Sequence, residues 1–205
     1  MLVIVNYGIG NIGSIKNMLK KVGHRAVVSS SRDDVARADR LILSGMGSFD
    51  SGMEFLNQNR LIDVLHEKVL EKRTPLLGIC LGMQVLTEKS EEGSFHGLGF
   101  IKGETVRFSV PERQEGFRIP HMGWNTVDVK KKSALFEGLY GETRFYFAHS
   151  YHVLPAVPSD ILATTCYGYE FTSCVQKDNI VGVQFHPEKS HLFGMKLLRN
   201  FIERI

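Results

Sequence analysis

The chain has 205 residues, of which 43% are hydrophobic and 23% charged, the composition of an ordinary globular protein. Its 25 Lys and Arg residues against 22 Asp and Glu residues give a net charge of +3, too small an excess to indicate a nucleic-acid or membrane surface. No apolar run reaches the ~18 residues of a membrane span, and the N-terminal segment lacks the pattern of a secretory signal.

The first half of the chain alternates between short apolar runs and segments with helical spacing. The runs, which predict strands, are residues 2–5, 26–28, 41–43 and 75–79. The segments that predict helices are residues 12–22, 55–70 and 81–88. Strands that alternate with helices in this way predict a parallel sheet covered by helices on both faces.

The second half, from Gly99 to Gln184, consists of short β-rich pieces broken by Gly, Pro and charged turns. The predicted strands there include residues 106–108, 145–147, 161–163 and 180–183. Residues 192–205 close the chain with a helical pattern. Because there is no internal repeat and no linker, we expect one α/β domain over residues 1–205. Its mostly parallel sheet would be flanked by helices and would carry an antiparallel β portion in the C-terminal half.

A glycine-rich turn, Gly8-Ile9-Gly10-Asn11-Ile12-Gly13, lies between the first predicted strand and helix. Its spacing matches the fingerprint of dinucleotide-binding folds, and Asp33 lies about where a ribose-binding acid would be. The alternative is that the glycines only permit a tight strand-to-helix turn. The pattern alone leaves a nicotinamide-binding module and a plain turn both open.

The three cysteines are irregularly spaced and do not form a disulfide framework, which predicts a reducing, cytoplasmic setting. Cys80 follows a predicted strand, precedes a predicted helix and is flanked by Gly78 and Gly82. This is the pattern of a nucleophile elbow, with Cys in place of Ser. The alternative is a buried structural cysteine, but a thiol at a helix N-terminus is favoured as the reactive thiolate. Cys166 and Cys174 have no such glycines, and we expect them to be core or surface thiols.

Two backbone positions are candidates for an oxyanion hole. The N–H of Leu81 directly follows the nucleophile and would point to where negative charge develops. The segment Ser44-Gly45-Met46-Gly47 follows the third predicted strand, at the same sheet edge as Cys80. It is either the second donor or a plain turn, and the sequence alone leaves this open.

A nucleophilic thiol needs a base, and the base needs a residue that orients it. His186 and Glu188 lie two residues apart at the end of a predicted strand, where an extended chain places both side chains on one side. The carboxylate can then hold the imidazole in one tautomer. His149 and His152 are competitors, and as a helical pair they could bind a metal. Their surroundings predict a strand instead, so we expect no metal site.

Six blocks spread over the whole chain carry a family resemblance. They are Asn6-Tyr7-Gly8-Ile9-Gly10-Asn11, Gly45-Met46-Gly47, Leu77-Gly78-Ile79-Cys80-Leu81-Gly82-Met83-Gln84, Pro120-His121-Met122-Gly123-Trp124-Asn125, Tyr146-Phe147-Ala148-His149-Ser150-Tyr151 and Gly182-Val183-Gln184-Phe185-His186-Pro187-Glu188-Lys189-Ser190. With them the chain resembles the class I glutamine amidotransferases. The first and fourth blocks resemble in particular the subgroup of glutaminase subunits that serve imidazole glycerol phosphate synthesis.

The resemblance implies an enzyme that hydrolyses glutamine to glutamate without cofactor or metal. Cys80 would attack the side-chain amide, His186 would protonate the departing ammonia and Glu188 would orient His186. The glutamine would be held by Gln84 and by the backbone around Gly47, Ser150 and Tyr151.

The resemblance also implies a protein partner. The ammonia would pass to a barrel-shaped cyclase subunit, which would use it to make imidazole glycerol phosphate in histidine biosynthesis. Asn11, His121 and Trp124 match the face that meets this partner in a heterodimer. The glycine-rich opening turn would then be an interface loop and not a dinucleotide site.

Two alternative functions share the same elbow. Paralogous subunits supply ammonia for amidation of a surface-polysaccharide sugar, and a stand-alone thiol hydrolase would need no partner. The chain also departs from the family at the turn after the third strand, which usually begins Pro-Gly and here begins Ser44-Gly45. Because proline restricts φ, we expect Ser44 to leave this turn more mobile.

Overall fold

The structure is a computed structural model that describes residues 1–6, 11–109, 118–139 and 141–205. Its strands are β1 (Leu2–Asn6), β2 (Ala26–Ser29), β3 (Arg40–Gly45), β4 (Leu76–Cys80), β5 (Lys89–Ser90), β6 (Gly103–Arg107), β7 (His121–Thr126), β8 (Asp128–Val129), β9 (Arg144–His149), β10 (Tyr151–Pro155), β11 (Ile161–Tyr167), β12 (Tyr169–Lys177) and β13 (Ile180–Val183). Its helices are α1 (Ile12–Lys21), α2 (Arg32–Arg37), α3 (Phe49–Gln58), α4 (Ile62–His66), α5 (Leu81–Gln84) and α6 (His191–Arg204). Single helical turns are η1 (Glu67–Glu71), η2 (Ala134–Phe136), η3 (Pro158–Asp160) and η4 (Pro187–Lys189).

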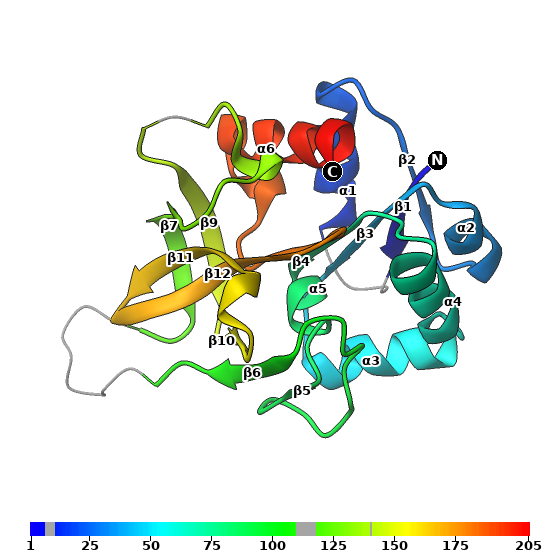
Figure 1. Cartoon of the computed structure of the whole chain (residues 1–205), viewed down its shortest axis with the longest axis horizontal. Helices are drawn as coiled ribbons and strands as arrows, with labels where there is room; N and C mark the ends of the chain where they lie inside the picture. The colour runs from blue at the N-terminus through cyan, green and yellow to red at the C-terminus, as the bar shows by residue number, and fades with distance from the viewer. Residues whose placement is uncertain (7–10, 110–117, 140) are drawn as a thin grey trace.

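The parallel part of the main sheet has the strand order β2-β1-β3-β4-β13 (Figure 1). From β13 the sheet continues through β12, β10 and β6, which pair in antiparallel fashion. The antiparallel hairpin β11–β12 extends away from the helices (Figure 1). The predicted α/β fold, a mostly parallel sheet with an antiparallel portion in the C-terminal half, is therefore confirmed.

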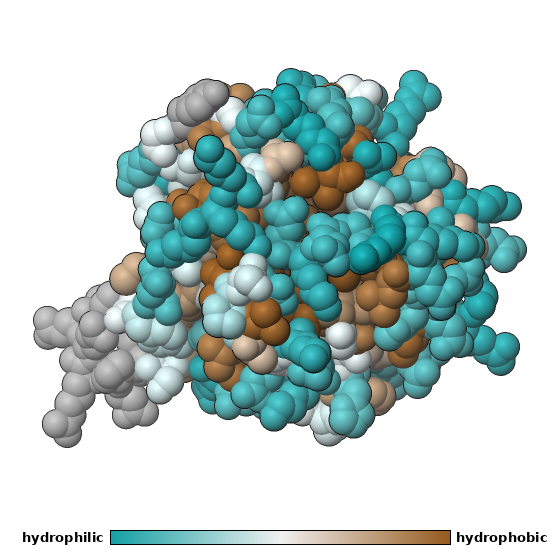
Figure 2. Space-filling view, in the orientation of Figure 1, coloured by the Kyte–Doolittle hydropathy of each residue, from teal (hydrophilic) through white to brown (hydrophobic). Residues whose placement is uncertain are grey.

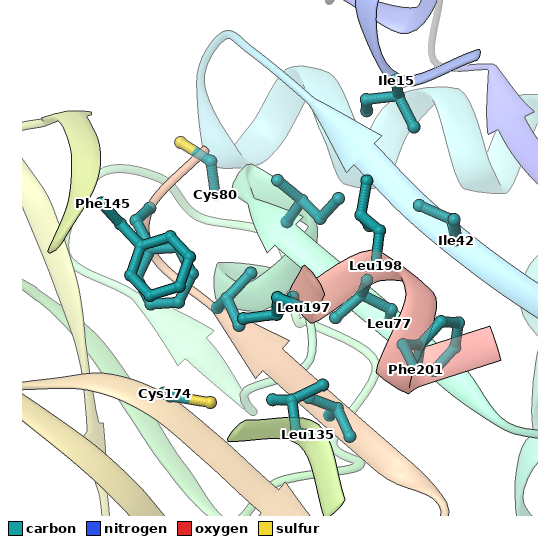
Figure 3. Packing of buried hydrophobic residues seen from close by; sticks show 14 of the residues in the cluster. Ile15, Ile42, Leu77, Cys80, Leu135, Phe145, Cys174, Leu197, Leu198 and Phe201 are labelled. Atoms are coloured by element: carbon teal, nitrogen blue, oxygen red, sulfur yellow. The ribbon is translucent and has the colours of Figure 1, made fainter. Parts of the chain in front are cut away.

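Helices cover both faces of the parallel strands because alternate residues of each strand point to opposite faces. Ile4 and Leu77 lie in one apolar cluster with α1 and α6. Val3 and Leu76, one position away, lie in a second cluster with α2, α3 and α4. Figure 3 shows Leu197, Leu198 and Phe201 of α6 in the first cluster, which extends to Cys80 at the end of β4.

The strands β7 and β9 form a separate two-stranded antiparallel sheet beside the main one (Figure 1). His121 lies directly opposite His149 in this pair. An isolated bridge between Tyr146 of β9 and His186 fastens it to the segment after β13. The small sheet thus stands next to the C-terminal ends of β4 and β13.

The predicted helix over residues 81–88 is wrong in its second half, because α5 ends at Gln84. The carbonyl of Val85 accepts from the backbone N–H of Leu98, and the carbonyl of Leu86 from that of Ile101. The chain leaves α-helical geometry at this point, because the backbone N–H groups of Leu86 and Thr87 donate three residues back, to Met83 and Gln84, and not four. The single helix expected over residues 55–70 is wrong: α3 begins earlier, at Phe49, and ends at Gln58, and α4 with η1 forms a second helical segment from Ile62. The helix α2 lies outside the predicted elements.

One face of the molecule is mainly hydrophilic. On the face drawn in Figure 2, hydrophobic residues appear as separated spots among hydrophilic ones. Within the described ranges, no helix combines the length and apolar character needed to cross a membrane.

Candidate active site

Cys80 lies at the point where β4 turns into α5. Its backbone has φ +54° and ψ −109°, a conformation that residues other than glycine rarely adopt. A Cβ atom on Gly78 would lie 2.5 Å from the carbonyl oxygen of Gly82, and one on Gly82 would lie 1.9 Å from that of Leu43. Both glycines are therefore sterically required, as a nucleophile elbow needs.

His186 and Glu188 form a buried pair next to Cys80. Nδ1 of His186 lies 2.8 Å from Oε1 of Glu188, and the side chains are 3% and 1% exposed. The prediction that an extended chain places them side by side is wrong in its geometry, since Glu188 lies in the 3₁₀ turn η4. The backbone N–H of His186 donates to the backbone carbonyl of Tyr146, and the Ser190 hydroxyl donates to the His186 carbonyl. These bonds fix the turn that brings the carboxylate back to the ring.

Burial lowers the pKa of His186, but its hydrogen bonds to Cys80 and Glu188 outweigh burial and raise the pKa to about 10. The imidazole is therefore protonated at neutral pH. A protonated imidazole that contacts both a thiol and a carboxylate is arranged to stabilise a thiolate and to deliver a proton to a leaving group.

A pocket of about 390 Å³ opens above Cys80, a volume suited to a small molecule. Six of the predicted site residues line it: Gly47, Cys80, Leu81, Gln84, Ser150 and Tyr151. They come from the ends of β3 and β4, from α5, and from the β9–β10 connection. The structure therefore brings the predicted nucleophile, oxyanion-hole and substrate-binding positions to one cavity.

The segment after β3 lies beside the elbow. Gly45 pairs with Cys80 in the parallel ladder, and Gly47 has φ +131°, which glycine accommodates. Ser44 is buried within β3 and pairs with Ile79, so it belongs to the strand and not to the turn. Strand pairing therefore holds Ser44 itself, and the greater mobility expected of the turn that follows it stays a prediction.

Sequence reasoning missed three residues of the site, Gln184, Glu92 and Lys189, the last of which lines the pocket beside the ring of Tyr146. Gln184 is buried, and its Nε2 lies 3.7 Å from Sγ of Cys80. Glu92 lines the pocket and accepts from the backbone N–H of Phe49, at the start of α3. Gln184 lies two residues before His186, so the strand period could have indicated it. Nothing near Glu92 in the sequence indicated a site, since a loop from elsewhere in the chain delivers it.

The two histidines weighed as competitors of His186 have other partners. Nδ1 of His149 lies 2.7 Å from the Tyr151 carbonyl, and Nε2 of His152 lies 2.8 Å from the Tyr169 hydroxyl. They lie on β9 and β10, not on one helix. Among the described residues, no three His, Cys, Asp or Glu side chains gather as a metal site would require.

The residues predicted to meet a partner differ in exposure. Trp124 is 45% exposed and stacks on His191, and Asn11 is half-buried at the start of α1. His121 is 2% exposed, so its side chain lies beneath this surface and any partner contact would fall to its neighbours. Gly8 and Gly10 lie outside the described residues, and Asp33 is exposed on α2.

The model of the family "Glutamine amidotransferase class-I" matches residues 3–205. The chain belongs to the class-I glutamine amidotransferases. It is 54% identical over 204 residues to "Imidazole glycerol phosphate synthase subunit HisH 2" of Methanococcus maripaludis, with 100% of both chains covered. It is 49% identical over 205 residues to the protein of the same name from Pseudomonas aeruginosa, again with 100% of both covered.

Two solved structures share the fold. A crystal structure of a glutamine amidotransferase has a TM-score of 0.74 at 21% identity and covers 98% of this chain and 97% of its own. The glutaminase domain of Trypanosoma brucei CTPS, with bound acivicin, has a TM-score of 0.67 at 15% identity and covers 100% of this chain and 94% of its own. At such identities they show the amidotransferase fold alone. Family membership makes the chain an enzyme of the glutamine amidotransferase class.

Proposed function

We propose that this chain is a glutaminase subunit that supplies ammonia to a synthase partner, with Cys80, His186 and Glu188 as its catalytic triad. The observation that carries the proposal is the bonded series Cys80–His186–Glu188, in which Cys80 lines the pocket and the other two residues lie buried behind it. The whole of residues 1–205 would act as this one glutaminase domain.

The reaction follows from the charges of the triad. The Cys80 thiolate attacks the side-chain carbonyl carbon of glutamine, and the backbone N–H groups of Gly47 and Leu81 receive the oxyanion. The C–N bond breaks as the imidazolium of His186 gives its proton to the leaving nitrogen. Water then attacks the thioester, His186 accepts a proton from it, and glutamate leaves. Glu188 keeps the ring of His186 in place throughout.

The pocket wall suits a free amino acid. Glu92 and Lys189 supply one negative and one positive side chain, which complement the ammonium and carboxylate of glutamine. Gln84 and the backbone at Ser150 and Tyr151 supply further hydrogen-bonding groups that line the same pocket. We infer that these groups select glutamine over a peptide, whose amino and carboxyl groups are joined to other residues.

The partner in this proposal is a cyclase subunit that uses the ammonia to make imidazole glycerol phosphate in histidine biosynthesis. The names of the relatives support this assignment. Asn11 and Trp124 would contact the partner on the face beside the pocket. All three cysteines are free, which suits the reducing cytoplasm.

Glutamate release tests the proposal. It is measured for the wild-type chain and for Cys80→Ala, each alone and with the cyclase subunit and its substrate. We expect the wild type to be slow alone and much faster in the complex, and Cys80→Ala to be inactive. Synthesis supported by added ammonia should survive Cys80→Ala. Undiminished glutamate release by Cys80→Ala would falsify the triad, and coupling only to a polysaccharide synthase would overturn the pathway.

A further inference from the structure

Beneath the pocket lies a row of hydrogen bonds in which every donor points the same way. His149 Nδ1 lies 2.7 Å from the Tyr151 carbonyl, which can only accept, so this nitrogen carries the proton. Nε2 of His149 is then unprotonated and lies 3.1 Å from Nδ1 of His121, so Nδ1 of His121 must donate. The bare Nε2 of His121 in turn accepts from Nδ2 of Asn125 at 3.2 Å. The direction of the row is thus fixed by its last acceptor.

Asn125 anchors the start of the row. Its Nδ2 also donates to the Cys166 carbonyl, and its Oδ1 accepts from the backbone N–H of Thr126. These two bonds assign the orientation of the amide. The row therefore has one consistent arrangement of neutral groups from Asn125 to Tyr151.

The row ends at the Tyr151 carbonyl, where a second set of hydrogen bonds from the side of the nucleophile meets it. The Tyr151 carbonyl also accepts from Nε2 of Gln84, which donates as well to Oε1 of Gln184. Nε2 of Gln184 then faces Sγ of Cys80 at 3.7 Å. One wall of the glutamine pocket and the amide beside the thiol are thus held by the same set of bonds.

The two histidines remain neutral in this environment. Burial lowers the pKa of His121 to about 4, and burial likewise lowers the pKa of His149. His121 packs between the rings of Phe147 and Tyr167 and does not line the pocket. It therefore reaches the substrate site only through His149.

We propose that His121 and His149 are positioning residues that hold the Tyr151 carbonyl in the geometry required for glutamine binding. The inference rests on the proposed function of the pocket. One face of β7 then carries His121, which supports the pocket. The other face carries Met122 and Trp124, which are exposed and available to a partner. A partner that moved β7 would move the first donor of the row.

Kinetics of the complex test the role of His121. His121→Phe keeps the ring and removes both nitrogens, His121→Asn restores a donor near Nδ1, and His152→Phe is the matched control. His152 is a buried histidine that also packs on Phe108 but bonds to Tyr169. We expect His121→Phe to lower kcat/KM for glutamine roughly tenfold, chiefly by raising KM, since one buried hydrogen bond is lost. His121→Asn should recover most of this loss, and His152→Phe should stay within about twofold.

The control variants decide the outcome. Equal losses in His121→Phe and His152→Phe, or no recovery in His121→Asn, would show that the cluster only packs. Synthesis driven by added ammonia should be the same in all variants. If the wild-type complex itself released no glutamate, the proposed function would fail and not the positioning role.

The direction of the row can be measured without activity or variants. Nitrogen NMR of the chain with ¹⁵N-labelled histidine distinguishes protonated from bare ring nitrogens. We expect His121 and His149 both to carry the proton on Nδ1 at pH 7.5. A proton on Nε2 of either ring would overturn the row.

Discussion

Nδ1 of His186 lies 2.8 Å from Oε1 of Glu188, and the two side chains are almost completely buried. The negative charge of Glu188 is one of the causes that raise the pKa of His186 to about 10. Since a buried imidazolium would otherwise be unstable, the hydrogen bond to Cys80 and the carboxylate of Glu188 together keep the proton on the ring.

Glu188→Gln should therefore reduce glutamine-dependent turnover by about a hundredfold or more, because the neutral amide cannot hold the imidazolium or its tautomer. The pKa of His186 should fall, and the pH profile of kcat should shift with it. Glu203→Gln is the matched control, since Glu203 also bonds a histidine, His24, but at the exposed surface. Turnover within threefold of the wild type in Glu188→Gln would contradict the role of the carboxylate.

Stability should fall in acid because three buried histidines are neutral in the folded chain. Burial lowers the pKa of His121 to about 4, and burial also lowers the pKa values of His149 and His152. In the unfolded chain they titrate near ~6.5. Between these values the unfolded state binds more protons, so the free energy of unfolding decreases as the pH falls below about 6.5.

The free energy of unfolding should change with pH by up to about 1.4 kcal/mol per pH unit for each such histidine. Urea unfolding between pH 7.5 and 4.5 measures it, and His152→Phe should make the decrease shallower. His96→Gln, at an exposed position, should leave the slope unchanged. His186 acts in the opposite sense: its raised pKa stabilises the fold below about pH 6.5, and this stabilisation is lost as the pH rises through about 10.

Gly82→Ala should destabilise the fold by about 3 kcal/mol or more, because its Cβ would lie 1.9 Å from the backbone oxygen of Leu43. The Leu43 backbone cannot move away without breaking the β3–β4 ladder, in which Leu43 pairs with Gly78. Gly13→Ala, where a Cβ meets nothing within 4 Å, should instead stabilise α1 by about 0.5–1 kcal/mol. Thermal and urea unfolding compare the two. A Gly82→Ala chain as stable as the wild type would rule out the close approach at the elbow.

Trp124→Ala should weaken binding to the cyclase partner by roughly tenfold or more, since exposed tryptophans are frequent anchors of interfaces. Trp124 stacks on His191 with the rings 5.6 Å apart and nearly parallel, so its orientation is already set in the free chain. Leu154→Ala removes another large exposed side chain and is the control. Titration calorimetry gives both affinities. Equal affinity of Trp124→Ala and the wild type would move the interface elsewhere.

The elements that the sequence predicted best are those whose signal is local. β1, β3 and β4 are buried on both faces and therefore read as continuous apolar runs. The glycines around Cys80, and the short spacing of His186 and Glu188, likewise lie within a few residues of the chemistry. The two catalytic segments could be proposed without knowledge of the fold.

The features that escaped prediction depend on residues far apart in the chain. α5 ends at Gln84, whose carbonyl accepts from the backbone N–H and hydroxyl of Thr87 and from the hydroxyl of Thr105 on β6. Glu92 reaches the pocket only because its loop is bound to the start of α3, through the Phe49 N–H and the carboxylate of Asp50. The bond from Gln84 to the Tyr151 carbonyl spans 67 residues. No local pattern contains such contacts.

The pairing of β4 with β13 has a consequence during protein synthesis. Cys80 and Gln184 are 104 residues apart, and His186 and Glu188 follow only after β13. As the chain leaves the ribosome N-terminus first, β1 to β4 can assemble while the place beside β4 is still vacant. The nascent chain thus carries a cysteine with neither base nor neighbouring amide. The thiol gains its base and its neighbouring amide only when β13, one of the last strands to be synthesised, pairs with β4.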